Sequence, residues 1–131
     1  MNVLPMNVLV DTSVWVAHFR ASNPALTKLL FMDEAMIHPM VLLELACGTP
    51  PEPRRKTLGD IALLRPAQQA NHNEVMDFIE RERLYGLGCG LVDLTLLASA
   101  LITPDTGLWT LDKRLDELAA RFGVRFLPNL H

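Results

Sequence analysis

Short, continuously apolar runs alternate along the chain with longer stretches in which apolar residues recur every three or four positions. The runs are typical of buried strands, and the periodic stretches are typical of helices packed against them. The clearest run covers residues 8–10, which are Val-Leu-Val, and it ends abruptly at Asp11. A strand that is apolar on both faces indicates a central position in a parallel sheet with helices on both sides.

Proline and glycine residues divide the chain into further elements. Pro24 and Pro39 suit the first turn of a helix, Gly48 suits the left-handed residue after a helix end, and residues 49–53 suit an irregular loop. The pattern predicts strands over 6–10, 35–38, 108–111 and 124–127, and helices over 13–19, 25–32, 39–47, 54–64, 68–85, 91–101 and 113–122. Strands that alternate with helices in this way predict an α/β fold, a three-layer α/β/α sandwich with a mostly parallel central sheet.

Composition sets the size of the fold and its expected surroundings. The 131 residues, half of them hydrophobic, suffice for one domain with one core, and residues 1–5 are expected to be a loose extension. No apolar run is long enough to span a membrane and the amino terminus lacks the features of a signal peptide, so we expect a cytoplasmic protein. The two cysteines, Cys47 and Cys89, predict neither a disulfide nor a thiolate zinc site.

Four carboxylates interrupt the most apolar stretches of the chain. Asp11 and Asp112 each follow a predicted strand, Glu44 lies within an apolar helix, and Asp93 lies near the start of another. Acidic side chains are seldom buried in such surroundings without a compensating partner. Each acid also has a simpler interpretation: the two that follow strands could cap the next helix, Asp93 could favour the positive end of its helix dipole, and Glu44 could pair with an arginine.

The four acids together suggest a shared site at the carboxyl ends of the strands, where parallel sheets bind ligands. Four carboxylates in one partly dry cleft repel one another unless some are protonated or a divalent cation neutralises them. Oxygen ligands of this kind suit Mg²⁺ or Mn²⁺. Such an ion lowers the pKa of a bound water and offsets charge on a phosphate during in-line displacement. The residues therefore predict metal-assisted hydrolysis of phosphodiester bonds.

The ordered set of residues resembles the PIN-domain nucleases, and more narrowly the VapC-type toxins of bacterial toxin–antitoxin pairs. The resemblance covers nearly the whole chain and rests on residues 10–15 (Val-Asp-Thr-Ser-Val-Trp), on Glu44 and Asp93 within apolar helices, and on residues 110–112 (Thr-Leu-Asp). It implies that the catalytic, metal-binding acids are Asp11, Glu44, Asp93 and Asp112. It also implies that the polar residues around these acids are Thr12, Ser13 and Thr110.

The resemblance also implies an activity and partners. Members of the family cut single-stranded regions of RNA and leave a 5′-phosphate and a 3′-hydroxyl. They commonly form homodimers, and a VapB-type antitoxin inhibits them by covering the acidic site. The candidates for contact with the RNA backbone are Arg54, Arg55, Lys113 and Arg114, although each is equally consistent with a solvated helix face.

Three other functions compete with this interpretation. A phospho-acceptor receiver domain is also a small α/β sandwich that binds Mg²⁺, but it needs adjacent acids after its first strand, whereas Asp11 is alone and Glu44 is helical. A PIN fold that acts only as a binding module normally lacks one or more of the acids. An RNA-processing nuclease without toxicity remains an alternative, which an adjacent antitoxin gene would argue against.

Overall fold

The computed structural model describes residues 7–128, so the loose extension expected for residues 1–5 lies outside the described residues. Four strands and seven helices occur in this part of the chain. The strands are β1 (Asn7–Val10), β2 (Ala35–Ile37), β3 (Arg65–Pro66) and β4 (Thr106–Trp109), and the helices are α1 (Thr12–Arg20), α2 (Pro24–Phe31), α3 (Pro39–Cys47), α4 (Arg54–Ala62), α5 (His72–Glu82), α6 (Leu91–Ile102) and α7 (Lys113–Arg121).

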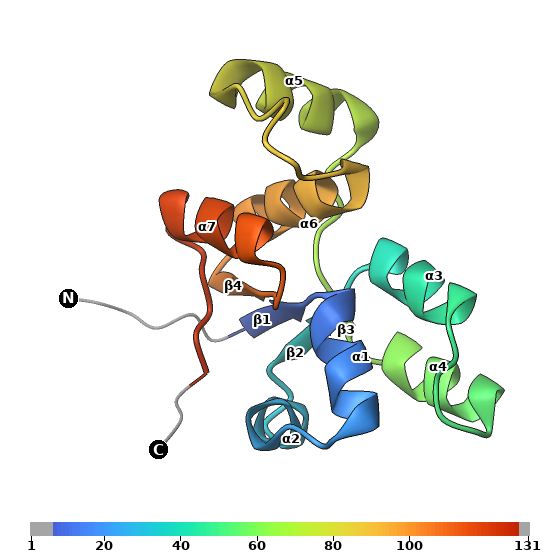
Figure 1. The fold of residues 1–131 in the computed structure, drawn as a ribbon. Helices are drawn as coiled ribbons and strands as arrows, with labels where there is room; N and C mark the ends of the chain where they lie inside the picture. The colour runs from blue at the N-terminus through green and yellow to red at the C-terminus, as the bar shows by residue number, and fades with distance from the viewer. Residues whose placement is uncertain (1–6, 129–131) are drawn as a thin grey trace.

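The strands form one sheet in the order β3-β2-β1-β4, and every pair is parallel. Strand β1 lies inside the sheet, with Leu9 opposite Met36 of β2 on one side and opposite Leu108 of β4 on the other. Helices α5, α6 and α7 gather above the sheet in Figure 1, whereas α1 and α2 lie below it. The fold is therefore the predicted three-layer α/β/α sandwich.

The hydrophobic core lies between the sheet and the helices that cover it. Residues 8–10 of β1 are at most 1% exposed, because helices cover both faces of the strand. Helix α6 is buried continuously from Leu94 to Ala100, so it forms the core of its layer. Helix α7 is amphipathic and buries Leu115, Leu118 and Ala119. No helix within residues 7–128 is both long and apolar enough to cross a membrane.

The helix predicted over 68–85 is shorter at both ends. Residues 68–71 are not helical, because the Gln68 N–H donates to Thr103 Oγ1 (3.0 Å) and the Ala70 N–H donates to Ser99 Oγ (3.0 Å). These bonds fix the segment against α6, and α5 begins only after its capping residue Asn71. It ends at Glu82, because Arg83 takes a left-handed conformation with φ of 56°.

Other differences from the predicted backbone are smaller. The strand predicted over 108–111 is β4, which covers Thr106–Trp109 and so begins and ends two residues earlier. Residues 124–127 do not form a strand, since the chain runs beside β4 only at the single bridge between Leu108 and Arg125. Strand β3 was not expected, because its two residues are exposed and include a proline, which only an edge strand tolerates. Gly48 follows α3 with φ of −99°, so it is extended and not left-handed.

Candidate active site

Two neighbouring strands bring together the polar residues that directly follow them at the carboxyl edge of the sheet. Val10 of β1 lies opposite Trp109 of β4, so Asp11 and Thr110 are adjacent as the strands end. The Asp11 N–H donates to the Trp109 carbonyl oxygen at 2.9 Å and continues the ladder by one bond. Asp11 and Thr110 therefore lie at the carboxyl ends of parallel strands, where open α/β sheets bind ligands.

Asp11 is held by two hydroxyl groups. Its Oδ2 accepts from Thr110 Oγ1 and from Ser13 Oγ, each at 2.7 Å. Both hydroxyls are themselves fixed, because Ser13 Oγ accepts from the Leu111 N–H and Thr110 Oγ1 accepts from the Asp112 N–H, each at 3.0 Å. Asp11 occupies the N-cap position of α1, as the simpler interpretation expects, but its side chain makes no capping hydrogen bond, so the carboxylate is not used to cap the helix.

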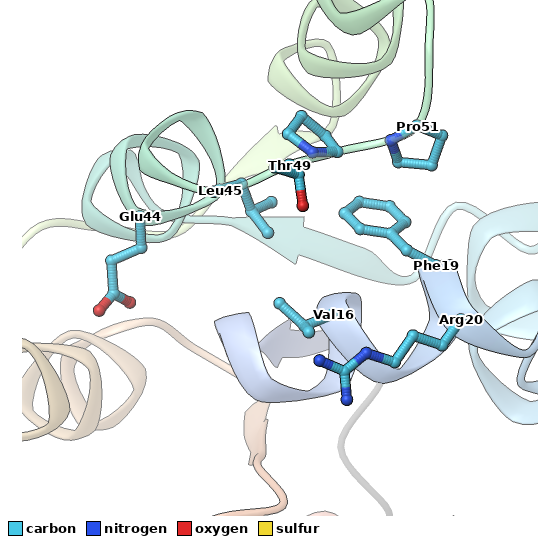
Figure 2. A pocket seen from close by; sticks show the side chains of 9 residues that line it. Val16, Phe19, Arg20, Glu44, Leu45, Thr49 and Pro51 are labelled. Carbon is cyan, nitrogen blue, oxygen red and sulfur yellow. The ribbon is translucent and has the colours of Figure 1, made fainter.

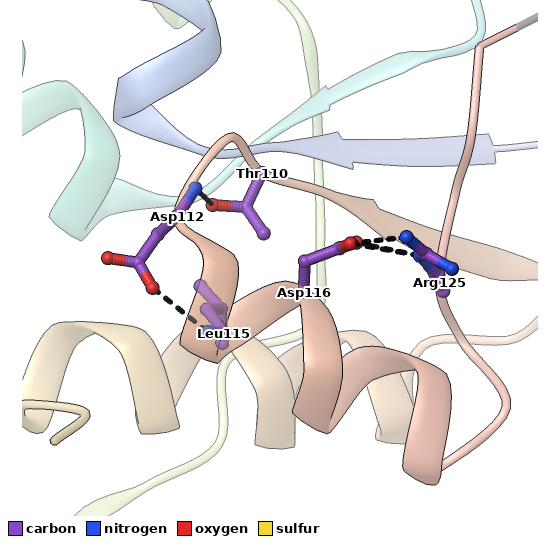
Figure 3. A network of polar contacts seen from close by, with 5 residues as sticks. All are labelled: Thr110, Asp112, Leu115, Asp116 and Arg125. Carbon is purple, nitrogen blue, oxygen red and sulfur yellow. Dashed lines mark hydrogen bonds and ion pairs between the residues drawn. The ribbon is translucent and has the colours of Figure 1, made fainter.

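Asp112 does cap the helix that follows it. Its Oδ1 accepts from the Leu115 N–H at 2.9 Å, which confirms the simpler interpretation of this residue. Figure 3 shows this bond and, further along α7, the separate ion pair between Asp116 and Arg125. The other carboxylate oxygen of Asp112 makes no hydrogen bond within residues 7–128, so capping does not exclude a second role.

Glu44 projects from the middle of α3 and meets the start of α1. Its Oε1 accepts a 2.6 Å hydrogen bond from Thr12 Oγ1, and in Figure 2 its side chain points away from α3. It takes part in none of the ion pairs formed within residues 7–128, so the expected alternative of pairing with an arginine is wrong. A pocket of about 430 Å³ adjoins Glu44 and is lined by Val16, Phe19, Arg20 and the loop at 48–51.

Asp93 lies in the first turn of α6, half-buried, where its Oδ2 accepts a long 3.5 Å hydrogen bond from the Gly90 N–H. Burial raises the pKa of Asp93, the Gly90 bond lowers it, and the charges of the other three acids raise it further. These acids are Asp11, Asp112 and Glu44. The other three carboxylates therefore lie near enough to Asp93 for their charges to act on it.

The site is more open than expected. Asp11 is buried, at 5% exposed, but Asp93 is only half-buried and both Glu44 and Asp112 are exposed. The cleft is therefore not dry, and the expected partial desolvation applies to Asp11 and Asp93 but not to Glu44 or Asp112. Water reaches the remaining carboxylates, which reduces their mutual repulsion without removing it.

The four carboxylates share one pattern of hydrogen bonding. Each has one oxygen that accepts a bond from a nearby hydroxyl or backbone N–H, and a second oxygen that accepts none from the residues described. For Asp11 the second oxygen is open to solvent, because Trp15 Nε1 is the only buried side-chain polar atom between residues 7 and 128 without a partner. Each acid is thus oriented through one oxygen and free at the other.

This donor set fits a hydrated divalent cation. The ion pairs in the described part of the chain use Asp33, Asp60, Glu82 and Asp116, so no basic side chain neutralises the four acids there. Between residues 7 and 128 no three acidic, histidine or cysteine side chains are gathered closely enough to enclose an ion by themselves. Mg²⁺ keeps several waters and takes few protein ligands directly, which an open set of carboxylates accommodates.

The four candidate RNA-contacting residues have different surroundings. Arg54 donates from Nη1 to the Gly48 carbonyl at 3.0 Å and from Nη2 to the Ala46 carbonyl, so its guanidinium closes the end of α3. Arg55 and Lys113 are exposed and make no side-chain hydrogen bond or ion pair with the rest of the described chain. The Arg114 side chain packs against Gly88, which the sequence pattern does not predict.

Sequence comparison agrees with this geometry. The family model of the PIN domain matches residues 8–121. The chain is 44% identical over 117 residues to ribonuclease VapC32 of Mycobacterium tuberculosis strain CDC 1551 / Oshkosh, and equally to VapC32 of strain ATCC 25618 / H37Rv. These alignments cover 89% of this chain and 94% of each relative. The chain therefore belongs to the PIN-domain family and, within it, to the VapC type.

Proposed function

We propose that this chain is a metal-dependent endoribonuclease and the toxin component of a VapBC-type toxin–antitoxin pair. The observation that carries the proposal is that Asp11, held by Thr110 at the ends of β1 and β4, Asp112 and Glu44 all act by their charges on Asp93, and that none of the four acids pairs with a basic side chain among the described residues. The name ribonuclease, which the similar VapC32 proteins carry, supports RNA as the substrate. Reaction at a phosphodiester bond is the chemistry that such a set of oxygen ligands serves.

In this proposal Asp11, Glu44 and Asp93 hold the ion, which is Mg²⁺ or Mn²⁺, and Asp112 completes the set or serves a second ion. When bound, the ion supplies water of lowered pKa and a positive charge beside the scissile phosphate. The carboxylates contribute through their free oxygens. Glu44 approaches from α3 and Asp93 from α6, so the two helices set the width of the site.

The hydroxyl residues hold the acids in place. Ser13 and Thr110 fix the buried Asp11 through one oxygen, and Thr12 fixes Glu44 in the same way. Groups that orient metal ligands typically change metal affinity by about 10- to 100-fold when they are removed. We therefore assign these three hydroxyls to the alignment of the acids and not to the reaction itself.

The proposal extends to the setting in which the enzyme works. Residues 1–131 act as one PIN domain, and the chain works in the cytoplasm as a homodimer. A VapB-type antitoxin is the partner that inhibits it by covering the acidic site. The exposure of Glu44 and Asp112 is consistent with access by a macromolecule, whether substrate or inhibitor.

The test is expression in bacterial cells of the wild type, Asp11→Asn and the control Glu117→Gln, followed by mapping of new 5′-phosphate RNA ends. Glu117 is an exposed acid on α7 outside the acidic site. We expect new ends with the wild type and the control only, and no cleavage by the purified protein in excess chelator. Full cleavage by Asp11→Asn, or cleavage in chelator, contradicts the proposal.

A further inference from the structure

A short loop lies between the acidic site and an arginine. The loop is Gly88-Cys89-Gly90, which leads into α6. At one end the Gly90 N–H donates to Asp93 Oδ2 at 3.5 Å. At the other end the Arg114 side chain rests on Gly88, so closely that a Cβ there would lie 2.8 Å from both Cδ and Cζ of Arg114. The loop therefore contacts Arg114 at one end and Asp93, a candidate metal ligand, at the other.

Cys89, in the middle of this loop, lies near both Arg114 and two of the acids. Burial raises the pKa of Cys89, and the charges of Asp93 and Asp112 raise it further, whereas the charge of Arg114 lowers it. The Cys89 side chain is thus close enough to Asp93, Asp112 and Arg114 to feel the charge of each. The guanidinium stands at the edge of the acidic site.

Nothing within the described residues pairs with this guanidinium. Arg114 is exposed, and it makes no hydrogen bond or ion pair with any residue from 7 to 128. It is also the second residue of α7, where the helix dipole disfavours a positive charge. Its five N–H donors match the geometry of phosphate oxygens, which they can bind in pairs. An unpaired cation beside four acids offsets the repulsion that an RNA backbone meets there.

We propose that Arg114 binds an RNA phosphate beside the one that is cleaved, and that Gly88 is the positioning residue that seats the guanidinium at the edge of the site. This inference rests on the proposed ribonuclease function. Gly88 suits the role because it has φ of +87° and no side chain, so the arginine packs directly on the backbone. Any larger residue displaces the guanidinium.

The first test measures binding of a short, fluorescein-labelled single-stranded oligoribonucleotide of mixed sequence, in the Asp11→Asn background so that it stays intact. We expect Arg114→Ala to weaken binding about tenfold, as loss of a charged hydrogen bond does. The salt dependence of log K should become shallower by about 0.7, the share of one phosphate contact on a single strand. Arg114→Lys keeps the charge and should recover part of the affinity.

The control is Lys28→Ala. Lys28 is an exposed residue of α2, a helix that supplies none of the four acids, and like Arg114 it makes no side-chain hydrogen bond or ion pair among the described residues. The control also removes one positive charge, and it should leave both affinity and salt dependence near those of the reference. Equal weakening by Lys28→Ala and Arg114→Ala overturns the inference, because it shows that net charge alone is responsible.

The second test asks whether the contact between Gly88 and Arg114, and not strain in the loop, is responsible for binding. Gly88→Ala should weaken RNA binding as Arg114→Ala does, and combining the two should add little, because both remove the same contact. The control is Gly86→Ala: Gly86 also has a positive φ, +73°, but a Cβ there meets nothing within 4 Å. Equal losses from Gly86→Ala and Gly88→Ala contradict a specific seat, because they show that strain in the loop alone is responsible.

The outcomes distinguish this inference from the function on which it rests. If the wild type does not cleave RNA and the Asp11→Asn reference does not bind the oligonucleotide, the proposed function fails. If the reference binds and Arg114→Ala binds equally well, the function stands and only the role of Arg114 fails. Thermal unfolding of each variant shows that a loss of binding is not a loss of fold.

Discussion

Thr12 Oγ1 donates a 2.6 Å hydrogen bond to Glu44 Oε1, which joins the first residue of α1 to the middle of α3. Glu44 is exposed, so packing alone does not fix its side chain. The bond sets the direction of the carboxylate and ties it to the residue that follows Asp11. A single hydroxyl therefore links two acids from distant parts of the sequence.

Thr12→Val removes this hydroxyl and keeps the shape of the side chain. We expect the Mn²⁺ concentration that gives half-maximal RNA cleavage to rise about tenfold, because Glu44 loses the group that orients it. Thr12→Ser keeps the hydroxyl and should stay near the wild type. The melting temperature should change little in both variants. An unchanged Mn²⁺ requirement in Thr12→Val contradicts the assigned role.

Arg54 is expected to matter for stability and not for RNA. Its guanidinium bonds the Gly48 and Ala46 carbonyls at the end of α3, where a positive charge also suits the helix dipole. Arg54→Ala should lower the free energy of unfolding by about 1 kcal/mol. Chemical denaturation measures the change, with Arg55→Ala as the control. A loss of RNA affinity without a loss of stability contradicts this assignment.

His38 predicts a pH dependence of stability. It is 2% exposed, its Nδ1 accepts from the Met40 N–H at 3.0 Å, and its Nε2 lies 3.2 Å from Ser99 Oγ. Burial lowers the pKa of His38, so below about pH 6.5 the unfolded chain binds a proton that the folded chain does not. The unfolded state then binds more protons, and the free energy of unfolding falls as the pH decreases.

The fall that His38 causes is at most about 1.4 kcal/mol per pH unit and ends below the folded pKa of the histidine. Denaturation curves between neutral pH and pH 5 measure it. The variant His38→Asn can still cap α3 through its amide oxygen but does not titrate, so its stability should depend less on pH. The same pH dependence in the variant and the wild type shows that other groups are responsible.

Asp93→Asn should stabilise the metal-free protein at neutral pH. Burial and the charges of Asp11, Asp112 and Glu44 raise the pKa of Asp93, so its ionised form disfavours the folded state. As the pH falls, Asp93 of the folded wild type takes up a proton before Asp93 of the unfolded chain does. The difference in stability between Asp93→Asn and the wild type should therefore become smaller at acidic pH. Thermal unfolding in chelator measures this, with the exposed Asp77→Asn as the control. A lower melting temperature for Asp93→Asn contradicts the repulsion.

Much of the fold could be predicted from the hydrophobic pattern, because its central elements are the most buried. The run at residues 8–10 indicates β1, and Pro39 together with the apolar stretch after it gives the bounds of α3 correctly. Strand β3 has no such signal, since both of its residues are exposed. The start of α5 depends on Ser99 and Thr103, which act from another helix, so no local pattern reveals it.

The identity of the site residues could be proposed from the sequence, but their surroundings could not. Acids within apolar stretches suggest burial, yet Glu44 is exposed. Its neighbour Leu43 is also 65% exposed, so no other element covers this part of α3. The contact between Gly88 and Arg114 joins residues from a loop and a helix, and only the packing of α7 beside α6 brings them together.

The convergence of the four acids on one cation is tested most directly by calorimetric titration of Mn²⁺ into the purified protein. We compare the wild type with Asp11→Asn and with Glu117→Gln, which removes an exposed acid outside the site. We expect the wild type and the control to bind Mn²⁺ with the same affinity and Asp11→Asn to lose that binding while keeping its fold. Unchanged binding in Asp11→Asn contradicts the shared site.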